Sequence, residues 1–176
     1  MKLNQLVFLD EFGATTNMAR TRARGPRGQR VVCKTPHGHW KVLSTIAALT
    51  TCGILGLGSF DGATDTETFL VFVRDGLVPN LKAGQVVVLD NLPAHKSPKI
   101  DELIESVGAR VMRLPPYSPD YNPIEMAISK AKSILRRLAR RTVDALLPAI
   151  AEAMDSITAA DAINFIRHCG YAATSK

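Results

Sequence analysis

The stretch QLVFLD, residues 5–10, decides the fold of this chain because it is a continuous apolar run that ends in a carboxylate. A second run of the same kind, VVVLD, occupies residues 86–90. Runs that are apolar on both faces are typical of central strands covered by helices on each side. We therefore predict an α/β fold in which these two strands are parallel neighbours at the centre of a mixed sheet.

The rest of the 176-residue chain predicts one domain, with hairpin strands first and helices later. Further strands are expected at residues 30–34, 40–49, 52–60 and 109–114, with a mobile loop at 13–29 and a hairpin corner at 35–39. Helices are expected to begin at Thr64 and Pro98 and to occupy residues 123–138, 143–157 and 160–169. Gly76 with Pro79 is expected to end the first helix, and Pro148 to delay or kink the fourth.

Residues 114–125, LPPYSPDYNPIE, form a stiff connector between a predicted strand and a predicted helix. Proline fixes φ and holds the preceding residue in extended geometry. Asn122 and Pro123 can cap the helix and fill its first position, which places Glu125 in the first turn. The alternative is an ordinary corner, in which Glu125 is only a favourable acid near a helix N-terminus.

Positive charge is distributed unevenly along the chain, whose net charge is +6. Residues 12–60 and residues 126–141 contain no acidic side chain, although both segments are rich in Arg and Lys. A solvated surface normally carries both signs, so this pattern favours a nucleic acid partner over a plain solvated face. The candidate DNA-binding residues are Arg20, Arg22, Arg24, Arg27, Arg30, Lys96, Lys132 and Arg136. No apolar run is long enough to span a membrane, and three cysteines without a C-x-x-C spacing indicate reduced thiols in the cytoplasm.

Three carboxylates are candidates for a metal site. If the strands that end at Asp10 and Asp90 are parallel neighbours, their ends lie about 5 Å apart. Two ionised carboxylates at that distance repel by about 3 kcal/mol, so they need a shared proton or a cation. Glu125 adds a third oxygen donor, and such a set suits Mg²⁺ or Mn²⁺ rather than Zn²⁺. Each aspartate alone could equally be a turn former at a strand end.

Four neighbouring polar residues are candidates for supporting these carboxylates: Glu11, Asn91, His95 and Asn122. His95 follows Asp90 by five residues and could orient a phosphate or a carboxylate. A loop histidine bonded to backbone is the alternative. Glu11 could equally be solvated.

Three blocks of the sequence resemble the signature blocks of DDE transposases: FLDEFG at 8–13, VVLDNLPAHKS at 87–97 and LPPYSPDYNPIEMAISKAK at 114–132. The resemblance is to the bacterial insertion-sequence branch of the Tc/mariner superfamily, in which 34 residues separate the last two acids, as they separate Asp90 and Glu125 here. It implies a ribonuclease-H-like fold with a five-stranded sheet and a catalytic triad of Asp10, Asp90 and Glu125. It also implies two Mg²⁺ ions, replaceable by Mn²⁺, and cleavage and strand transfer of double-stranded DNA by a homodimer in the bacterial cytoplasm.

The chain departs from full-length members of that family at its start. Those members carry helix-turn-helix modules ahead of the first catalytic Asp, whereas nine residues precede Asp10 here. We therefore expect element ends to be recognised with an upstream-encoded helix-turn-helix partner. Two alternatives stay open: a non-catalytic DNA-binding or dimerisation remnant of a truncated transposase, and a stand-alone nuclease of the same fold.

Overall fold

A mixed sheet of five strands forms the middle layer of the protein in the computed structural model, which describes residues 2–92, 95–116 and 118–171. The strand order is β3-β2-β1-β4-β5. The strands are β1 (Leu6–Thr15), β2 (Val42–Thr50), β3 (Gly53–Asp61), β4 (Val86–Leu89) and β5 (Arg110–Arg113). β1 pairs antiparallel with β2 and parallel with β4, so the predicted central parallel pair is confirmed.

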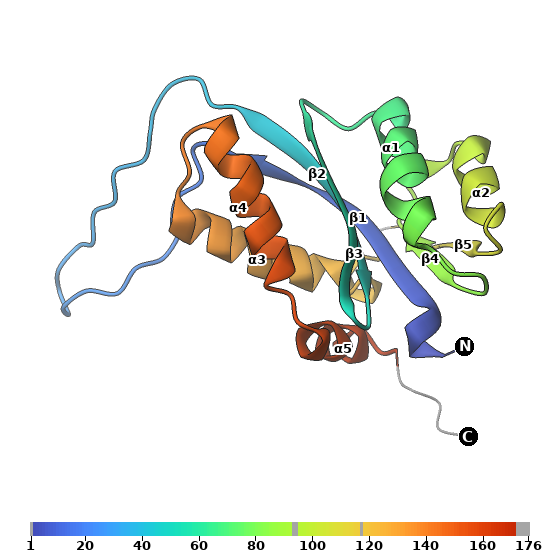
Figure 1. Cartoon of the computed structure of the whole chain (residues 1–176). Helices are drawn as coiled ribbons and strands as arrows, with labels where there is room; N and C mark the ends of the chain where they lie inside the picture. Colours follow the sequence, from blue (N-terminus) through green and yellow to red (C-terminus); the bar gives the residue numbers. More distant parts are fainter. Residues whose placement is uncertain (1, 93–94, 117, 172–176) are drawn as a thin grey trace.

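Helices cover both faces of this sheet, as Figure 1 shows. One face packs against α1 (Thr66–Phe72) and α2 (Pro98–Glu105), and the other against α3 (Ile124–Leu138), α4 (Val143–Asp155) and α5 (Ala159–His168). Successive residues of a strand point to opposite faces. Accordingly Phe8 of β1 joins the core beside α3, and Val7 and Leu9 join the core beside α1. The predicted layering is confirmed.

The prediction that β1 ends at Asp10 is wrong. β1 continues to Thr15 and stays paired with β2 as far as the Thr15–Val42 pair. Its parallel pairing with β4 stops at Phe8, because β4 itself ends at Leu89. The continuation is amphipathic, with Phe12 and Ala14 buried on one face, an alternation typical of a half-buried strand rather than of the loop predicted from residue 13. Asp10 therefore lies within a strand, at the point where one neighbouring strand has ended.

The predicted strand at 30–34 and the hairpin corner at 35–39 are also wrong. β1 and β2 are joined by a long excursion in which residues 20–41, called the arm below, are exposed and lack regular structure (Figure 1). The apolar residues that suggested a strand do not reach the core, since Val31 and Val32 are 46% and 78% exposed. The neighbouring residues are Gly, Pro and Arg, which do not form an apolar surface against which Val31 and Val32 could pack.

The first helix begins and ends differently from the prediction. Its N-cap is Asp65, whose carboxylate accepts from the backbone N–H of Thr68. The helix then runs on through a π-helical turn (Val73–Leu77) and a 3-10 turn (Val78–Asn80), so Gly76 does not end it. A Cβ on Gly56 of β3 would lie 2.9 Å from the carbonyl oxygen of Gly76, so the strand and this turn pack backbone to backbone.

The C-terminal helices agree with the prediction more closely. α4 begins at Val143, capped by Thr142, and continues through Pro148, so the expected delay of this helix is wrong. α5 begins with a capping box of Thr158 and Asp161, as expected. In the described part of the chain no helix has the length and apolar character needed to cross a bilayer.

Candidate active site

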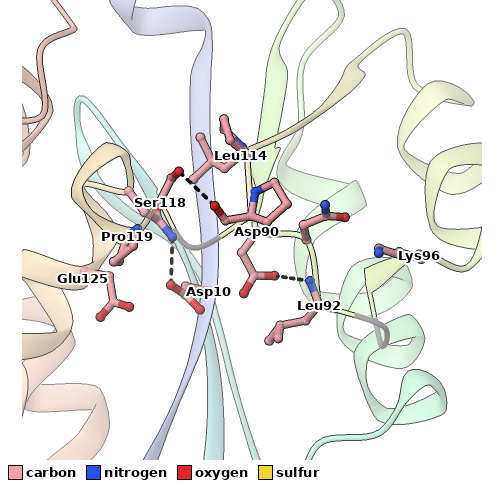
Figure 2. Close-up of a pocket in the computed structure, with 12 residues that line it drawn as sticks. Asp10, Asp90, Leu92, Lys96, Leu114, Ser118, Pro119 and Glu125 are labelled. Carbon is pink, nitrogen blue, oxygen red and sulfur yellow. Dashed lines mark hydrogen bonds between the residues drawn. The ribbon is translucent and has the colours of Figure 1, made fainter.

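A cavity of about 460 Å³ opens beside β1 where β4 has ended, and the three candidate carboxylates line it (Figure 2). Asp10 comes from β1, Asp90 follows β4, and Glu125 lies in the first turn of α3. The full lining is Asp10, Asp90, Asn91, Leu92, Lys96, Leu114, Pro115, Pro116, Ser118, Pro119, Asn122 and Glu125. The described residues of the connector between Leu114 and Pro119 thus form one wall of the cavity. Pro93, Ala94 and Tyr117 of the signature blocks lie outside the described residues.

Asp10 is the most buried of the three carboxylates, with 7% of its surface exposed. Its Oδ1 accepts from the backbone N–H of Glu11 at 2.7 Å, and its Oδ2 accepts from Nδ2 of Asn122 at 2.8 Å. Burial, with a smaller contribution from the charges of Glu125 and Asp90, raises the pKa of Asp10 to about 7 against the opposing Glu11 bond. The three acids therefore act on one another electrostatically across the cavity.

Asp90 is oriented by His95. Nδ1 of His95 lies 2.5 Å from Oδ1 of Asp90, and the backbone N–H of Leu92 donates to the same oxygen at 3.1 Å. Burial alone would raise the pKa of Asp90, but the bonds from His95 and Leu92 outweigh it and hold this pKa below its usual value. Asp90 is consequently an ionised carboxylate at neutral pH, whereas the pKa of Asp10 is shifted the other way.

The His95 ring is completely buried and tilted over the ring of Phe69, with centroids 4.1 Å apart. Its Nε2 lies 3.7 Å from Oε2 of Glu11. Burial opposes the charged ring, yet the hydrogen bond to Asp90 and the nearby carboxylate of Glu11 raise the pKa of His95 to about 9. His95 is thus a buried cation between two carboxylates, and the alternative of a ring bonded to backbone is not what the structure contains.

The connector presents Asn122 and Glu125 through a 3-10 turn, Pro119–Tyr121. The N–H of Asn122 donates to the Pro119 carbonyl at 2.8 Å, and the N–H of Glu125 donates to the Asn122 carbonyl at 3.1 Å. The prediction that Asn122 caps α3 is wrong: Pro123 holds the N-cap position, and the Asn122 side chain turns to Asp10. Asn122 Oδ1 is buried and has no partner among the described residues. Glu125 lies in the first turn, as predicted, and is exposed.

The family model described as DDE superfamily endonuclease matches residues 5–146 of the chain. The chain belongs to this family.

Solved structures similar to this DDE endonuclease chain are Mos1 transposases. The Mos1 transposase paired-end complex with left transposon end aligns with a TM-score of 0.72 and 16% sequence identity, over 95% of this chain and 52% of that chain. The structure of the Mos1 transposase catalytic domain and Raltegravir with Mn aligns with a TM-score of 0.69 and 13% identity, over 95% and 78%. The predicted ribonuclease-H-like fold is confirmed, and the chain spans about half the length of the Mos1 chains in the DNA complexes. A search of curated proteins found no significant match.

A residue that our reading of the sequence missed supports the site of this DDE endonuclease. Arg113, the last residue of β5, donates to both oxygens of Asp101 at 3.0 and 2.7 Å, and to the carbonyl of His95 at 3.0 Å. It therefore fixes α2 and the segment that carries His95 to the edge of the sheet. The sequence indicates where Arg113 lies. Neighbouring parallel strands end at the same edge of the sheet, so an arginine at the end of β5 lies beside the segment that follows β4.

The predicted DNA-binding residues of the endonuclease fall into two groups. Lys96 lines the cavity, and the ammonium of Lys132 lies 5.7 Å from the centroid of Phe12, two residues along β1 from Asp10. Arg20 and Arg22, where the arm begins, share a hollow with Arg136 of α3. The remaining three, Arg24, Arg27 and Arg30, lie on the exposed arm. The structure therefore brings Lys96 to the cavity of the carboxylates, places the other residues of the first group beside β1 and α3, and leaves the arm arginines exposed.

The donor set around the cavity fits a divalent cation of the hard type. Carboxylate and amide oxygens are the ligands that Mg²⁺ and Mn²⁺ prefer, and the buried, unpartnered Oδ1 of Asn122 adds one more such oxygen. Within the described ranges, however, no group of three His, Cys, Asp or Glu side chains is arranged to hold a metal ion as it stands. A cation would therefore require side-chain movement, for which exposed Glu125 is the obvious candidate.

Proposed function

We propose that this chain is the catalytic domain of a DNA transposase from the bacterial insertion-sequence branch of the Tc/mariner superfamily, the D-34-E group. It would cleave phosphodiesters at element ends and join them to target DNA. The observation that carries the proposal is the meeting of Asp10, Asp90 and Glu125 around one cavity in a chain of the DDE endonuclease family. The similar Mos1 structures include complexes with a transposon end and complexes with Mn and Mg, which supports DNA and a divalent metal as ligands here too.

Asp10, Asp90 and Glu125 would hold two Mg²⁺ ions, with Mn²⁺ as a substitute. When bound, such ions supply Lewis-acid stabilisation of the phosphate and lower the pKa of an attacking water or 3′-hydroxyl. The chain contributes the orientation of its ligands. Asn122 and the Glu11 N–H hold the two oxygens of Asp10 in place, while His95 and Leu92 both donate to Oδ1 of Asp90.

Glu11 and His95 would act on Asp90 rather than on DNA. A ring that is completely buried between two carboxylates cannot reach a phosphate, so His95 orients Asp90 and balances part of its charge. The Glu11 carboxylate lies near Nε2 of His95 and would balance part of the positive charge of the ring. Asn91 lines the cavity beside Asp90 and would support that carboxylate, as the sequence suggests.

Double-stranded DNA would lie along the basic residues near the cavity. Lys96 and Lys132 would hold phosphates close to the carboxylates, and Arg20, Arg22 and Arg136 would extend the contact along α3 towards the arm. Phosphate contacts of this kind give affinity without sequence specificity. Specific recognition of element ends would come from an upstream-encoded helix-turn-helix partner, within a homodimeric complex in the bacterial cytoplasm.

The test is cleavage of a supercoiled plasmid that carries the chromosomal DNA around the gene, in Mg²⁺, in Mn²⁺ and in EDTA. We expect metal-dependent nicking that Asp90→Asn lowers at least about 100-fold, because one ligand of the metal site is lost. Asp155→Asn, the same change at the exposed end of α4, is the matched control and should cut like wild type. Equal cleavage by wild type and Asp90→Asn would refute the triad.

A second candidate function is a non-catalytic DNA-binding or dimerisation remnant of a transposase. One observation favours it: within the described ranges the carboxylates do not form a ready metal site. Salt-sensitive DNA binding without any nicking in either metal, even with an upstream-encoded half added, would establish this candidate instead.

A further inference from the structure

The last described residue of the chain contacts the connector that carries Asn122 and Glu125. The hydroxyl of Tyr171 donates to the backbone carbonyl of Tyr121 at 2.8 Å. The Tyr171 ring also meets Phe8 of β1 edge-on, with centroids 5.0 Å apart and planes at 69°. Tyr171 therefore touches both the strand that carries Asp10 and the turn that precedes Asn122.

The position of Tyr171 is itself well defined. Gly170 has a φ of 86°, which lets the chain reverse after α5, and the N–H of Tyr171 donates back to the carbonyl of Ile166 at 3.2 Å. At the other end of α5, Nζ of Lys130 on α3 binds Oδ2 of Asp161 at 2.7 Å and the carbonyl of Ser156 at 3.3 Å. α5 is consequently fixed to α3 at its start and to the connector at its end.

The connector is bonded to β4 at Leu114 and to β1 at Asn122, and the stretch between these two residues has few bonds to the rest of the protein. Among the described residues of 115–121, the bond from Tyr171 is the one hydrogen bond that comes from outside the connector and α3. The other bonds there are local, such as the Ser118 hydroxyl to the Pro116 carbonyl and the Asn122 N–H to the Pro119 carbonyl. Tyr121, whose carbonyl Tyr171 holds, directly precedes Asn122. Movement at this carbonyl would thus be passed on to the Asn122–Asp10 bond.

We propose that Tyr171 is a positioning residue for the carboxylate site, setting Asn122 and Glu125 relative to Asp10. The proposal rests on the metal-dependent function proposed above. It also extends the functional unit, because Tyr171 and α5 lie beyond residue 146, where the match to the family model ends. Tyr171 touches no reacting group; it acts through the backbone of Tyr121.

The decisive variant is Tyr171→Phe, which keeps the ring against Phe8 and removes the hydroxyl. Tyr121→Phe is the matched control, since the Tyr121 side chain is 56% exposed and its backbone carbonyl is unchanged by the substitution. Mn²⁺ binding is measured calorimetrically without DNA, together with kcat and KM for plasmid nicking. Loss of one hydrogen bond at a site that must be held closely should weaken Mn²⁺ binding about five-fold and lower kcat by a similar factor, with KM for DNA unchanged.

Hydrogen exchange gives a readout that needs neither metal nor DNA. In Tyr171→Phe the amides of peptides covering residues 118–125 should exchange faster, while peptides from β1 and α3 beyond this region should not. A Tyr171→Phe protein that exchanges, binds Mn²⁺ and cuts like wild type would overturn the positioning role alone, with the proposed function intact. Wild-type protein that neither binds Mn²⁺ nor cuts would overturn the proposed function and this inference together. If Tyr171→Phe unfolds, Tyr171→Trp, which retains a ring and an N–H donor, takes its place with the same criteria.

Discussion

Asn122 donates from Nδ2 to Oδ2 of Asp10 across a sequence separation of 112 residues, at 2.8 Å. This bond joins the connector to the central strand, and it leaves Oδ1 of Asn122 buried without a partner among the described residues. One amide thus holds the least exposed carboxylate of the site and offers a further oxygen beside it.

Replacing Asn122 by Ala should therefore damage both stability and cleavage. An unsatisfied oxygen on buried Asp10 costs about 1–3 kcal/mol of unfolding free energy, measured by urea unfolding in EDTA. Nicking should fall by at least about ten-fold, because Asp10 loses the group that orients it. Asn164→Ala on the exposed face of α5 is the control. Unchanged nicking by Asn122→Ala would show that the bond serves the fold alone.

Asp10 should make the metal-free protein less stable as pH rises through the acidic range. Burial and the charges of Glu125 and Asp90 raise its folded pKa to about 7, above the ordinary value of 3.8. The folded state therefore binds the proton more tightly, so this stabilisation is complete below pH 3.8 and is lost as pH rises to 7. Asp10→Asn has no such proton. In EDTA, the free energy of unfolding of this variant minus that of wild type should therefore grow by about 2 kcal/mol between pH 5 and pH 8. A constant difference between the two proteins would mean that Asp10 is ionised throughout.

His95 should add a second pH range, above that of Asp10, in which the protein loses stability as pH rises. Its hydrogen bond to Asp90 and the nearby Glu11 carboxylate raise its folded pKa to about 9, above the ordinary 6.5, so the stabilisation is complete below pH 6.5 and is lost as pH rises through 9. We expect His95→Gln to be less stable than wild type at pH 6 by about 3 kcal/mol, and the two proteins to converge towards pH 9.5. Thermal unfolding across this range measures the difference. An exposed histidine changed in the same way, His37→Gln on the arm, should leave the pH profile of wild type unaltered.

The sequence predicted the layers of the fold and the meeting of the three acids, because continuous apolar runs and helical spacing report burial directly. The sequence did not predict the features that depend on packing between distant parts of the chain. The alternating residues after Asp10 are a strand because β2 pairs with them, and Val31 and Val32 stay exposed because nothing covers them. The bond from Asn122 to Asp10 depends on side-chain direction, which no local pattern encodes.

The arm should contribute DNA affinity without contributing stability. Arg24, Arg27 and Arg30 are exposed on a segment without regular structure, so changing all three to Gln should leave the melting temperature unchanged. Each lost phosphate contact lowers the slope of log K against log salt concentration by about 0.9, so the slope should fall by up to about 2.7 on any duplex sequence. The matched control changes three exposed cations elsewhere, Lys82, Lys99 and Arg110, to Gln, and it removes the same total charge. Fluorescence anisotropy at several salt concentrations separates the two variants, because a general charge effect would lower both slopes equally, whereas contact by the arm lowers only the first.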